Sequence, residues 1–204
     1  MLKIWGRDNS SNVRKVRWAA EEMGLAYEHI PAGGTFGVTN DANYRAMNPN
    51  GLVPCLEDDG LILWESNAIV RYLAAKHGKL WPSDPALRAV GDKWMDWANS
   101  TLHPALRDAF IGLLRTPPEK RNQAAIEASA QNTAKVLAIA DAALARQPYL
   151  SGEEFAMGDI PVGSYVYGWY GLPLERPVLP HLDAWFERLK QRPAYRKADM
   201  TPLT

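Results

Sequence analysis

Hydrophobic positions follow two different periods along this chain, strand-like at first and helical later. Leu2 to Trp5 and Ala26 to Ile30 are short apolar runs, and between them the segment Ser11 to Met23 repeats its apolar residues near a helical period until Gly24. This order predicts a β-α-β unit. Because such crossovers are right-handed, the two strands are expected to lie parallel in one sheet.

The segment from Ser11 to Met23 predicts an amphipathic helix. Its charged side chains alternate with the apolar ones and are expected to face water: Arg14, Lys15, Arg17, Glu21 and Glu22. Residues 31–43 are rich in Gly, Thr, Asn and Asp, which indicates a surface loop. A short helix is predicted to follow over Ala42 to Met47.

A hairpin and a helix are predicted next. Val53 to Glu57 and Leu61 to Trp64 are apolar runs joined by Asp58-Asp59-Gly60, and an apolar helical stripe begins after Glu65 and runs from Ser66 to His77. Pro54 is unusual because a proline cannot donate to a central strand ladder. A cis Val53-Pro54 bond would explain it, and would leave the backbone of Val53 able to pair with an extended peptide.

The periodicity is helical after the proline-containing segment that follows Gly78. Residues 1–78 are therefore predicted to form an α/β domain, residues 79–85 a linker, and residues 86–204 an all-helical domain. The helices expected in the second domain are Ala86 to Leu114, Pro117 to Arg146, Met157 to Trp169 and Leu179 to Gln191.

Composition excludes several classes of function. Lys plus Arg and Asp plus Glu are equal at 23 each with no block of like charge, so the chain has no electrostatic footprint for nucleic acid or an anionic membrane. No stretch approaches the roughly 20 apolar residues of a membrane span, and a soluble, cytoplasmic protein is expected. The single Cys55 allows neither an internal disulfide nor a Cys-x-x-Cys pair, and it is expected to be an inert core residue. No metal site is expected.

The Val53-Pro54 segment, the hairpin and the helix start Glu65-Ser66-Asn67 together resemble the signature of the cytosolic glutathione transferase family. The resemblance implies a thioredoxin-like N-terminal domain with an all-helical C-terminal domain, and glutathione as co-substrate. It assigns Val53 and Pro54 to the cysteinyl unit of glutathione, and Glu65 and Ser66 to its γ-glutamyl group. The simpler interpretation is that Glu65-Ser66 is an ordinary helix cap.

The turn before the first helix carries the expected thiol chemistry. In the serine-type, theta-, phi- or nu-like bacterial members that the chain resembles, the catalytic hydroxyl stands four residues before a basic residue, which here gives Ser10 before Arg14. Ser11 takes the place of the cysteine of thiol-using branches, and Asn12 is a second possible donor to the sulfur. Either serine is equally well explained as the N-cap, and both roles are compatible.

Two further subsites are expected from the resemblance. Relatives often hold the glycyl carboxylate of glutathione with polar side chains where this chain has Gly51 and Leu52, so Asn50, Arg45 or the 31–43 loop is expected to replace them. The electrophile pocket is expected along the first helix of the second domain. Its expected residues are Trp97, Thr101, His103, Arg107 and Phe110.

The sequence thus predicts a glutathione transferase that activates the glutathione thiol for attack on small hydrophobic electrophiles. The alternatives are a glutathione-dependent disulfide reductase or peroxidase, and a non-catalytic glutathione-binding module. The family resemblance also implies a homodimer.

Overall fold

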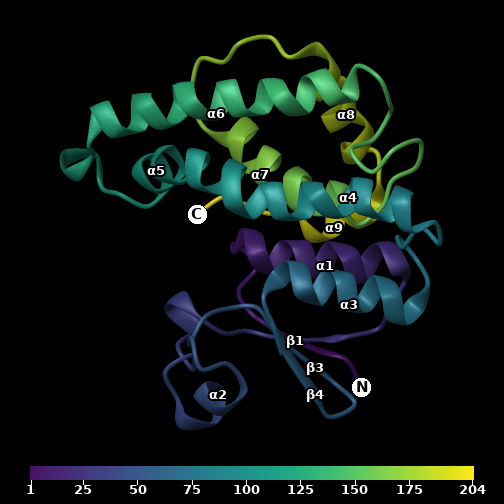
Figure 1. Ribbon diagram of the computed structural model, residues 1–204. Coiled ribbons are helices and arrows are strands. Elements are labelled where there is room, and N and C mark those ends of the chain that lie inside the picture. The colour runs from purple at the N-terminus through teal and green to yellow at the C-terminus, as the bar shows by residue number, and fades with distance from the viewer. The chain divides into compact units, whose positions relative to one another are not determined.

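The computed structural model describes residues 1–204. Contacts divide the chain into two compact units. Unit 1 comprises Met1–Trp81 together with Pro193–Thr201, and unit 2 comprises Pro82–Arg192 together with Pro202–Thr204. Each unit is built from consecutive elements, except that the last helix of the chain belongs to unit 1 (Figure 1).

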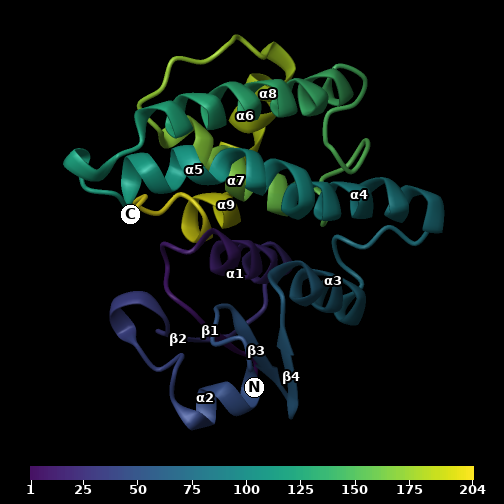
Figure 2. The same ribbon diagram turned by 60° about the vertical axis from the view of Figure 1, so that its left-hand side comes forward.

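Unit 1 is a small mixed sheet with helices on both faces. Its elements are β1 (Lys3–Trp5), α1 (Ser11–Met23), β2 (Glu28–Ile30), a 3₁₀ turn (Gly34–Phe36), α2 (Ala42–Met47), β3 (Cys55–Asp58), β4 (Leu61–Trp64), α3 (Ser66–His77) and α9 (Pro193–Ala198). The helices α1 and α3 lie on one side of the sheet and α2 on the other (Figures 1 and 2). This is the thioredoxin-like arrangement that the sequence predicted.

The strand order is β2-β1-β3-β4. β1 runs parallel to β2 and antiparallel to β3, so the predicted parallel pair is confirmed. The β3-β4 hairpin is confirmed too, with Asp59 and Gly60 at its tip at φ of 48° and 91°, as a two-residue turn of this kind requires. The expected first strand of the hairpin was placed too early, because β3 begins at Cys55 and Val53 lies outside it.

α1 packs against α3 and α9 as well as against β1. This surrounds the helix so completely that Arg14 and Lys15 are 0% exposed. The prediction that both side chains face water was therefore wrong. The sequence pattern of α1 alone did not indicate that α9, far away in the chain, would cover it.

Unit 2 is all-helical, as predicted. Its elements are α4 (Pro85–Trp97), a π-helical segment (Ala98–Leu102), α5 (His103–Leu114), a 3₁₀ turn (Pro118–Lys120), α6 (Gln123–Leu144), α7 (Asp159–Gly171) and α8 (Pro180–Lys190). α7 is buried along nearly its whole length and contacts α4, α5 and α8, so it forms the centre of the unit. No helix in the chain combines the length and the apolar character needed to cross a membrane.

Two helices of unit 2 differ from the prediction. The helix expected from Ala86 to Leu114 has a π-helical segment in the middle, where the His103 N–H donates to the Ala98 carbonyl five residues back. Pro104 follows directly, and because it has no N–H it cannot continue the regular ladder. The next helix begins after Asn122, not at Pro117, since the Asn122 side chain accepts from the Ala125 N–H at 3.1 Å and caps it there.

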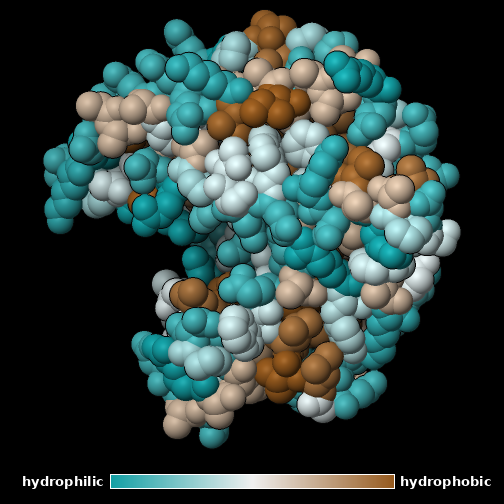
Figure 3. Space-filling view, viewed as in Figure 1, coloured by the Kyte–Doolittle hydropathy of each residue, from teal (hydrophilic) through white to brown (hydrophobic).

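Hydrophobic side chains also gather on the surface of unit 1 over β3 and β4 (Figure 3). β4 is one of the two edge strands of the sheet. Its Leu61 and Trp64 are 41% and 37% exposed. An edge strand with exposed apolar side chains is suited to contact another protein surface.

Candidate functional site

The predicted thiol site lies at the start of α1. Ser10 is the N-cap residue in an extended conformation, with φ −90° and ψ 120°, and its carbonyl accepts from the Arg14 N–H at 2.9 Å. The Ser10 hydroxyl makes no capping hydrogen bond, although the residue is only 8% exposed. The hydroxyl is therefore not committed to the cap. It lies where the N–H groups of the helix favour a negative charge.

Ser11 is engaged with the core of the unit. Its Oγ accepts from Arg14 Nη2 at 3.2 Å, and Arg14 Nη1 donates to the Asp199 carbonyl at 3.2 Å. Arg14 also forms an ion pair with the Asp199 carboxylate, whose Oδ1 lies 3.7 Å from Nε, and both side chains are 0% exposed. This pair connects α1 to the segment after α9.

Asn12 joins the first turns of two helices. Its Oδ1 accepts from Lys15 Nζ at 2.9 Å and from Ser66 Oγ at 3.3 Å. Ser66 is the first residue of α3 and is 3% exposed. The structure thus brings together Asn12 and Ser66, which the sequence assigned to thiol and γ-glutamyl binding respectively.

Glu65 precedes α3 in a rare backbone conformation. Its φ is +72°, a value that side chains other than glycine seldom adopt. Its carbonyl accepts from the Ile69 N–H at 2.9 Å, but no side-chain cap hydrogen bond is present. The simple explanation of Glu65-Ser66 as a side-chain cap is therefore not supported, and the exposed Glu65 carboxylate stands beside the first-turn N–H groups of the helix.

The backbone N–H and C=O of Val53, just before β3, make no backbone hydrogen bonds. The Val53-Pro54 peptide bond is cis, as predicted. The sheet begins at Cys55, and no backbone hydrogen bond involves Val53. The side chain of Val53 packs against a buried cluster that includes Ala32 and Tyr44. The side chain is thus anchored while the N–H and C=O are left for another extended strand.

Neighbouring residues hold this segment in place. The Leu52 carbonyl accepts from both Tyr44 Oη and Asn48 Nδ2, each at 2.8 Å. Asn50 is tied to Asn48 Oδ1 by its backbone N–H and by Nδ2, both at 3.1 Å. Arg45 donates to the Pro49 carbonyl at 2.8 Å. Asn50 and Arg45, the expected partners of the glycyl carboxylate, thus also shape the loop.

Sequence reasoning missed several residues of this region. The Arg7 side chain lies against Gly33 and against Gly34, the first residue of the 3₁₀ turn. A Cβ at Gly34 would lie 3.1 Å from Arg7 Cδ. Gly33 in turn approaches Val53, since a Cβ at Gly33 would lie 3.3 Å from Val53 Cγ1. Lys15 was missed because it was assigned to the exposed face of α1. Its position three residues after Asn12, on the same side of the helix, was the available signal.

The only cysteine is not suited to thiol chemistry. Cys55 is 0% exposed, and burial, with a smaller effect of Glu57, raises its pKa to about 11. A thiol with so high a pKa is a poor nucleophile at neutral pH. The chain also has no group of three or more His, Cys, Asp or Glu side chains placed to hold a metal ion.

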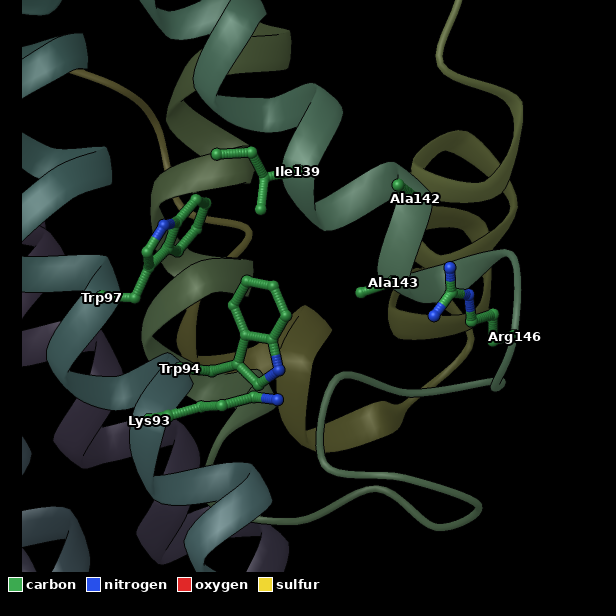
Figure 4. Close-up of a pocket in the computed structure, with 7 residues that line it drawn as sticks. All are labelled: Lys93, Trp94, Trp97, Ile139, Ala142, Ala143 and Arg146. Carbon is green, nitrogen blue, oxygen red and sulfur yellow. The ribbon is translucent and has the colours of Figure 1, made fainter.

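The residues expected to line the electrophile pocket spread along α4, the π segment and α5. Trp97 packs edge-on against Trp94, with ring centroids 5.0 Å apart, and both line a groove of about 450 Å³ with Ile139 and Arg146 of unit 2 (Figure 4). The exposed His103 stacks on Tyr165 at 5.1 Å. Thr101 lies in the π segment, Arg107 is exposed beside Asp108, and Phe110 packs near Gly168. Of the five, Trp97 alone borders this groove.

Two family models match this chain. The glutathione S-transferase N-terminal domain matches residues 1–75, and the glutathione S-transferase C-terminal domain matches residues 102–193. The first match lies within unit 1, and the second lies almost wholly within unit 2. The chain therefore belongs to the glutathione S-transferase family.

Individual relatives agree over the full length. Glutathione S-transferase GstB of Escherichia coli K12 is 51% identical, with 100% of both chains covered. Glutathione S-transferase 3 of Zea mays is 34% identical, with 96% of this chain and 92% of the relative covered. A solved structure of the theta class glutathione S-transferase from Xanthomonas axonopodis pv. citri with glutathione bound is 58% identical, covers 100% of this chain and 99% of its own, and has a TM-score of 0.97.

Proposed function

We propose that this protein is a glutathione transferase that activates the thiol of glutathione for attack on small hydrophobic electrophiles. The observation that carries the proposal is the backbone of Val53, which makes no backbone hydrogen bond, and the helix starts of the same unit with Ser10, Asn12 and Ser66 support it. Glutathione docks along Val53 in the manner of an added strand, with its thiol at the start of α1. Glu65 and Ser66 hold its γ-glutamyl group at the start of α3.

The energetics of thiol activation are adequate with this set of donors. Lowering a thiol pKa from about 8.5 to about 6.5 requires roughly 2.7 kcal/mol of preferential thiolate stabilisation. A hydrogen bond to a charged group contributes about 1.5–3 kcal/mol, and a helix N-terminus about 0.3–1 kcal/mol. A hydrogen bond from Ser10 together with the end of α1 is therefore sufficient.

The chemical step then needs only proximity. The glutathione thiol loses its proton to solvent, and the thiolate sulfur forms a bond to the electrophilic carbon. The leaving group departs with its bonding electron pair, or, in an addition, the neighbouring atom takes up the pair and a proton. Holding the two reactants together supplies much of the remaining rate enhancement.

The transferase proposal is favoured over the two alternatives. The relatives named above are all glutathione S-transferases. A reductase that used a protein thiol would need a reactive cysteine, and Cys55 is buried with its pKa raised. Disulfide reduction would have to draw both thiols from glutathione.

Replacing Ser10 with Ala tests the proposed thiol site. The pKa of bound glutathione is expected to rise by about one to two pH units, because one charge-assisted hydrogen bond is lost. Turnover of an aryl halide at neutral pH should fall about 3- to 25-fold, in line with the smaller thiolate fraction, while glutathione affinity stays nearly the same. A thiolate absorbance titration of the bound tripeptide measures this. Ser83→Ala, an exposed serine of unit 2, is the matched control. An unchanged titration would remove Ser10 from this role.

We also propose that the protein acts as a cytoplasmic homodimer, as the family resemblance implies. The exposed apolar edge of unit 1 at Leu61 and Trp64 supports a protein contact there. Light scattering should give twice the chain mass for the native protein. Leu61→Lys with Trp64→Lys should lower that mass towards the monomer, and a monomeric native protein would contradict the proposal.

A further inference from the structure

Lys15 is a buried side chain that contacts Asn12 of the proposed thiol site. It lies in the second turn of α1, is 0% exposed, and its Nζ is 2.9 Å from Asn12 Oδ1. The same oxygen accepts from Ser66 Oγ at 3.3 Å. One amide oxygen thus connects Lys15 to the first turns of α1 and α3.

The contact with Lys15 identifies which atom of the Asn12 side-chain amide is the oxygen and which is the nitrogen. An ammonium group has three donors and no acceptor, so the atom that it contacts must be the carbonyl oxygen. With Lys15 and Ser66 both donating, the two lone pairs of Oδ1 are used. The NH₂ group of Asn12 is consequently held at the opposite edge of the amide. There it can only donate.

Two charged groups outside α1 act on Lys15. Asp199 follows α9, and Glu65 precedes α3. Burial lowers the pKa of Lys15 to about 7, and the attraction of Asp199 and Glu65 opposes this effect. A neutral amine can accept a hydrogen bond, so only the charged form dictates the orientation of Asn12.

We infer that Lys15 is a positioning residue of the thiol site, which holds the Asn12 amide with its NH₂ group as donor to the glutathione thiolate. Lys15 does not itself contact the thiolate in this arrangement. The inference rests on the proposed function, because it needs glutathione to be bound at the start of α1. It goes beyond that function by assigning a role to a residue that underlies the site.

The test compares Lys15→Met with the wild type. Methionine fills a similar volume without a donor, so the Asn12 amide is able to turn. The pKa of bound glutathione should rise by about one pH unit. Turnover at neutral pH should fall about threefold, in line with the smaller thiolate fraction, with KM for glutathione nearly unchanged. Lys197→Met is the matched control, since Lys197 is exposed and pairs with Glu21 at 2.8 Å elsewhere in unit 1. It should leave the thiol pKa unchanged.

A double-mutant cycle with Asn12→Ala separates a positioning role from a direct effect of charge. If Lys15 acts through Asn12, Lys15→Met should raise the thiol pKa in the wild type but add nothing in the Asn12→Ala background. An equal rise in both backgrounds, or no rise in the wild type, overturns the inference. Lys15→Gln, which is uncharged and can donate or accept, replaces the methionine variant in the cycle if that variant fails to fold.

Failure of the inference differs from failure of the proposed function. If the wild-type protein does not lower the pKa of bound glutathione below that of the free thiol, the proposed function fails. If the wild type lowers it and Lys15→Met lowers it equally, only the role of Lys15 is overturned.

Discussion

The positive φ of Glu65 determines where its carboxylate lies relative to α3. A positive φ at a residue other than glycine is costly, and such residues concentrate at binding sites. At Glu65 it places an exposed carboxylate next to the N-terminus of α3 without using that carboxylate as a cap. The ligand group proposed for this side chain is the α-amino group of glutathione, which carries a positive charge.

Glu65→Ala is expected to weaken glutathione binding before it affects the chemical step. Alanine has the same difficulty with a positive φ as glutamate, so the change removes the carboxylate, and its attraction for Lys15, without adding backbone strain. A charge-assisted hydrogen bond of about 1.5–3 kcal/mol corresponds to a Kd about 10- to 100-fold higher. Isothermal titration calorimetry measures the Kd, and kcat at saturating glutathione should fall by a smaller factor than the Kd rises.

Glu28→Ala is a suitable control for this prediction. Glu28 is also an exposed glutamate of unit 1, but it begins β2. Its removal should leave the Kd unchanged. Equal Kd values for Glu65→Ala and the wild type would count against a γ-glutamyl site at Glu65.

At the scale of single residues, the sequence placed helix starts more reliably than it indicated burial. Ser10, Asn12 and Ser66 lie at the predicted starts of α1 and α3, because local sequence determines where a helix begins. Arg14 could not be recognised as buried. Its partner Asp199 is 185 residues away, and no local pattern encodes a contact at that distance.

The elements of unit 1 followed from the sequence closely. The structure has α1 over Ser11–Met23, α2 over Ala42–Met47 and α3 over Ser66–His77, which are the predicted bounds. Each of these helices has local end signals, such as Gly24 and Gly78 in the left-handed conformation after α1 and α3. The helix α9 was not predicted, because it is short and begins soon after the end of α8.

In unit 2, the start of α7 shows an element fixed by long-range hydrogen bonds. Asp159 is 0% exposed and accepts from the Leu150 N–H at 2.8 Å, the Trp185 Nε1–H at 2.9 Å and the Ala156 N–H at 3.3 Å. Burial raises its pKa, against the effect of these hydrogen bonds. The raised pKa means that burial disfavours the ionised form in the folded chain, but the carboxyl group connects α7 to α8 and to the preceding loop. Its role is structural.

At the scale of the whole molecule, the change from strand to helical periodicity was enough to predict the fold class. The predicted domains were consecutive ranges of the chain, so they could not include the association of Pro193–Thr201 with the first unit. This association matters for the site because Asp199 faces both Arg14 and Lys15. The electrostatics under the thiol site thus depend on residues from both ends of the sequence.

The buried Lys15 should therefore be visible in the stability of the whole protein as a function of pH. Its pKa is near 10.5 in the unfolded chain and about 7 in the folded one. Between these values the unfolded chain binds one more proton, so stability rises with pH across this window. Below about pH 7 the lysine is charged in both states, and the full cost of burying the charge is present.

Urea unfolding of the wild type and Lys15→Met from about pH 7 to about pH 10 tests this. From the low to the high end of this pH range, the free energy of unfolding of the wild type should increase by a few kcal/mol relative to that of the variant. The variant has no lysine at this position whose proton could be released on folding. Lys197→Met should stay parallel to the wild type, since the pKa of Lys197 is raised by Glu21 and both states keep the proton there. Parallel curves for Lys15→Met would show that Lys15 is not perturbed. A lysine that destabilises the fold at neutral pH while raising activity would be retained for its function, as expected where stability and activity are in conflict.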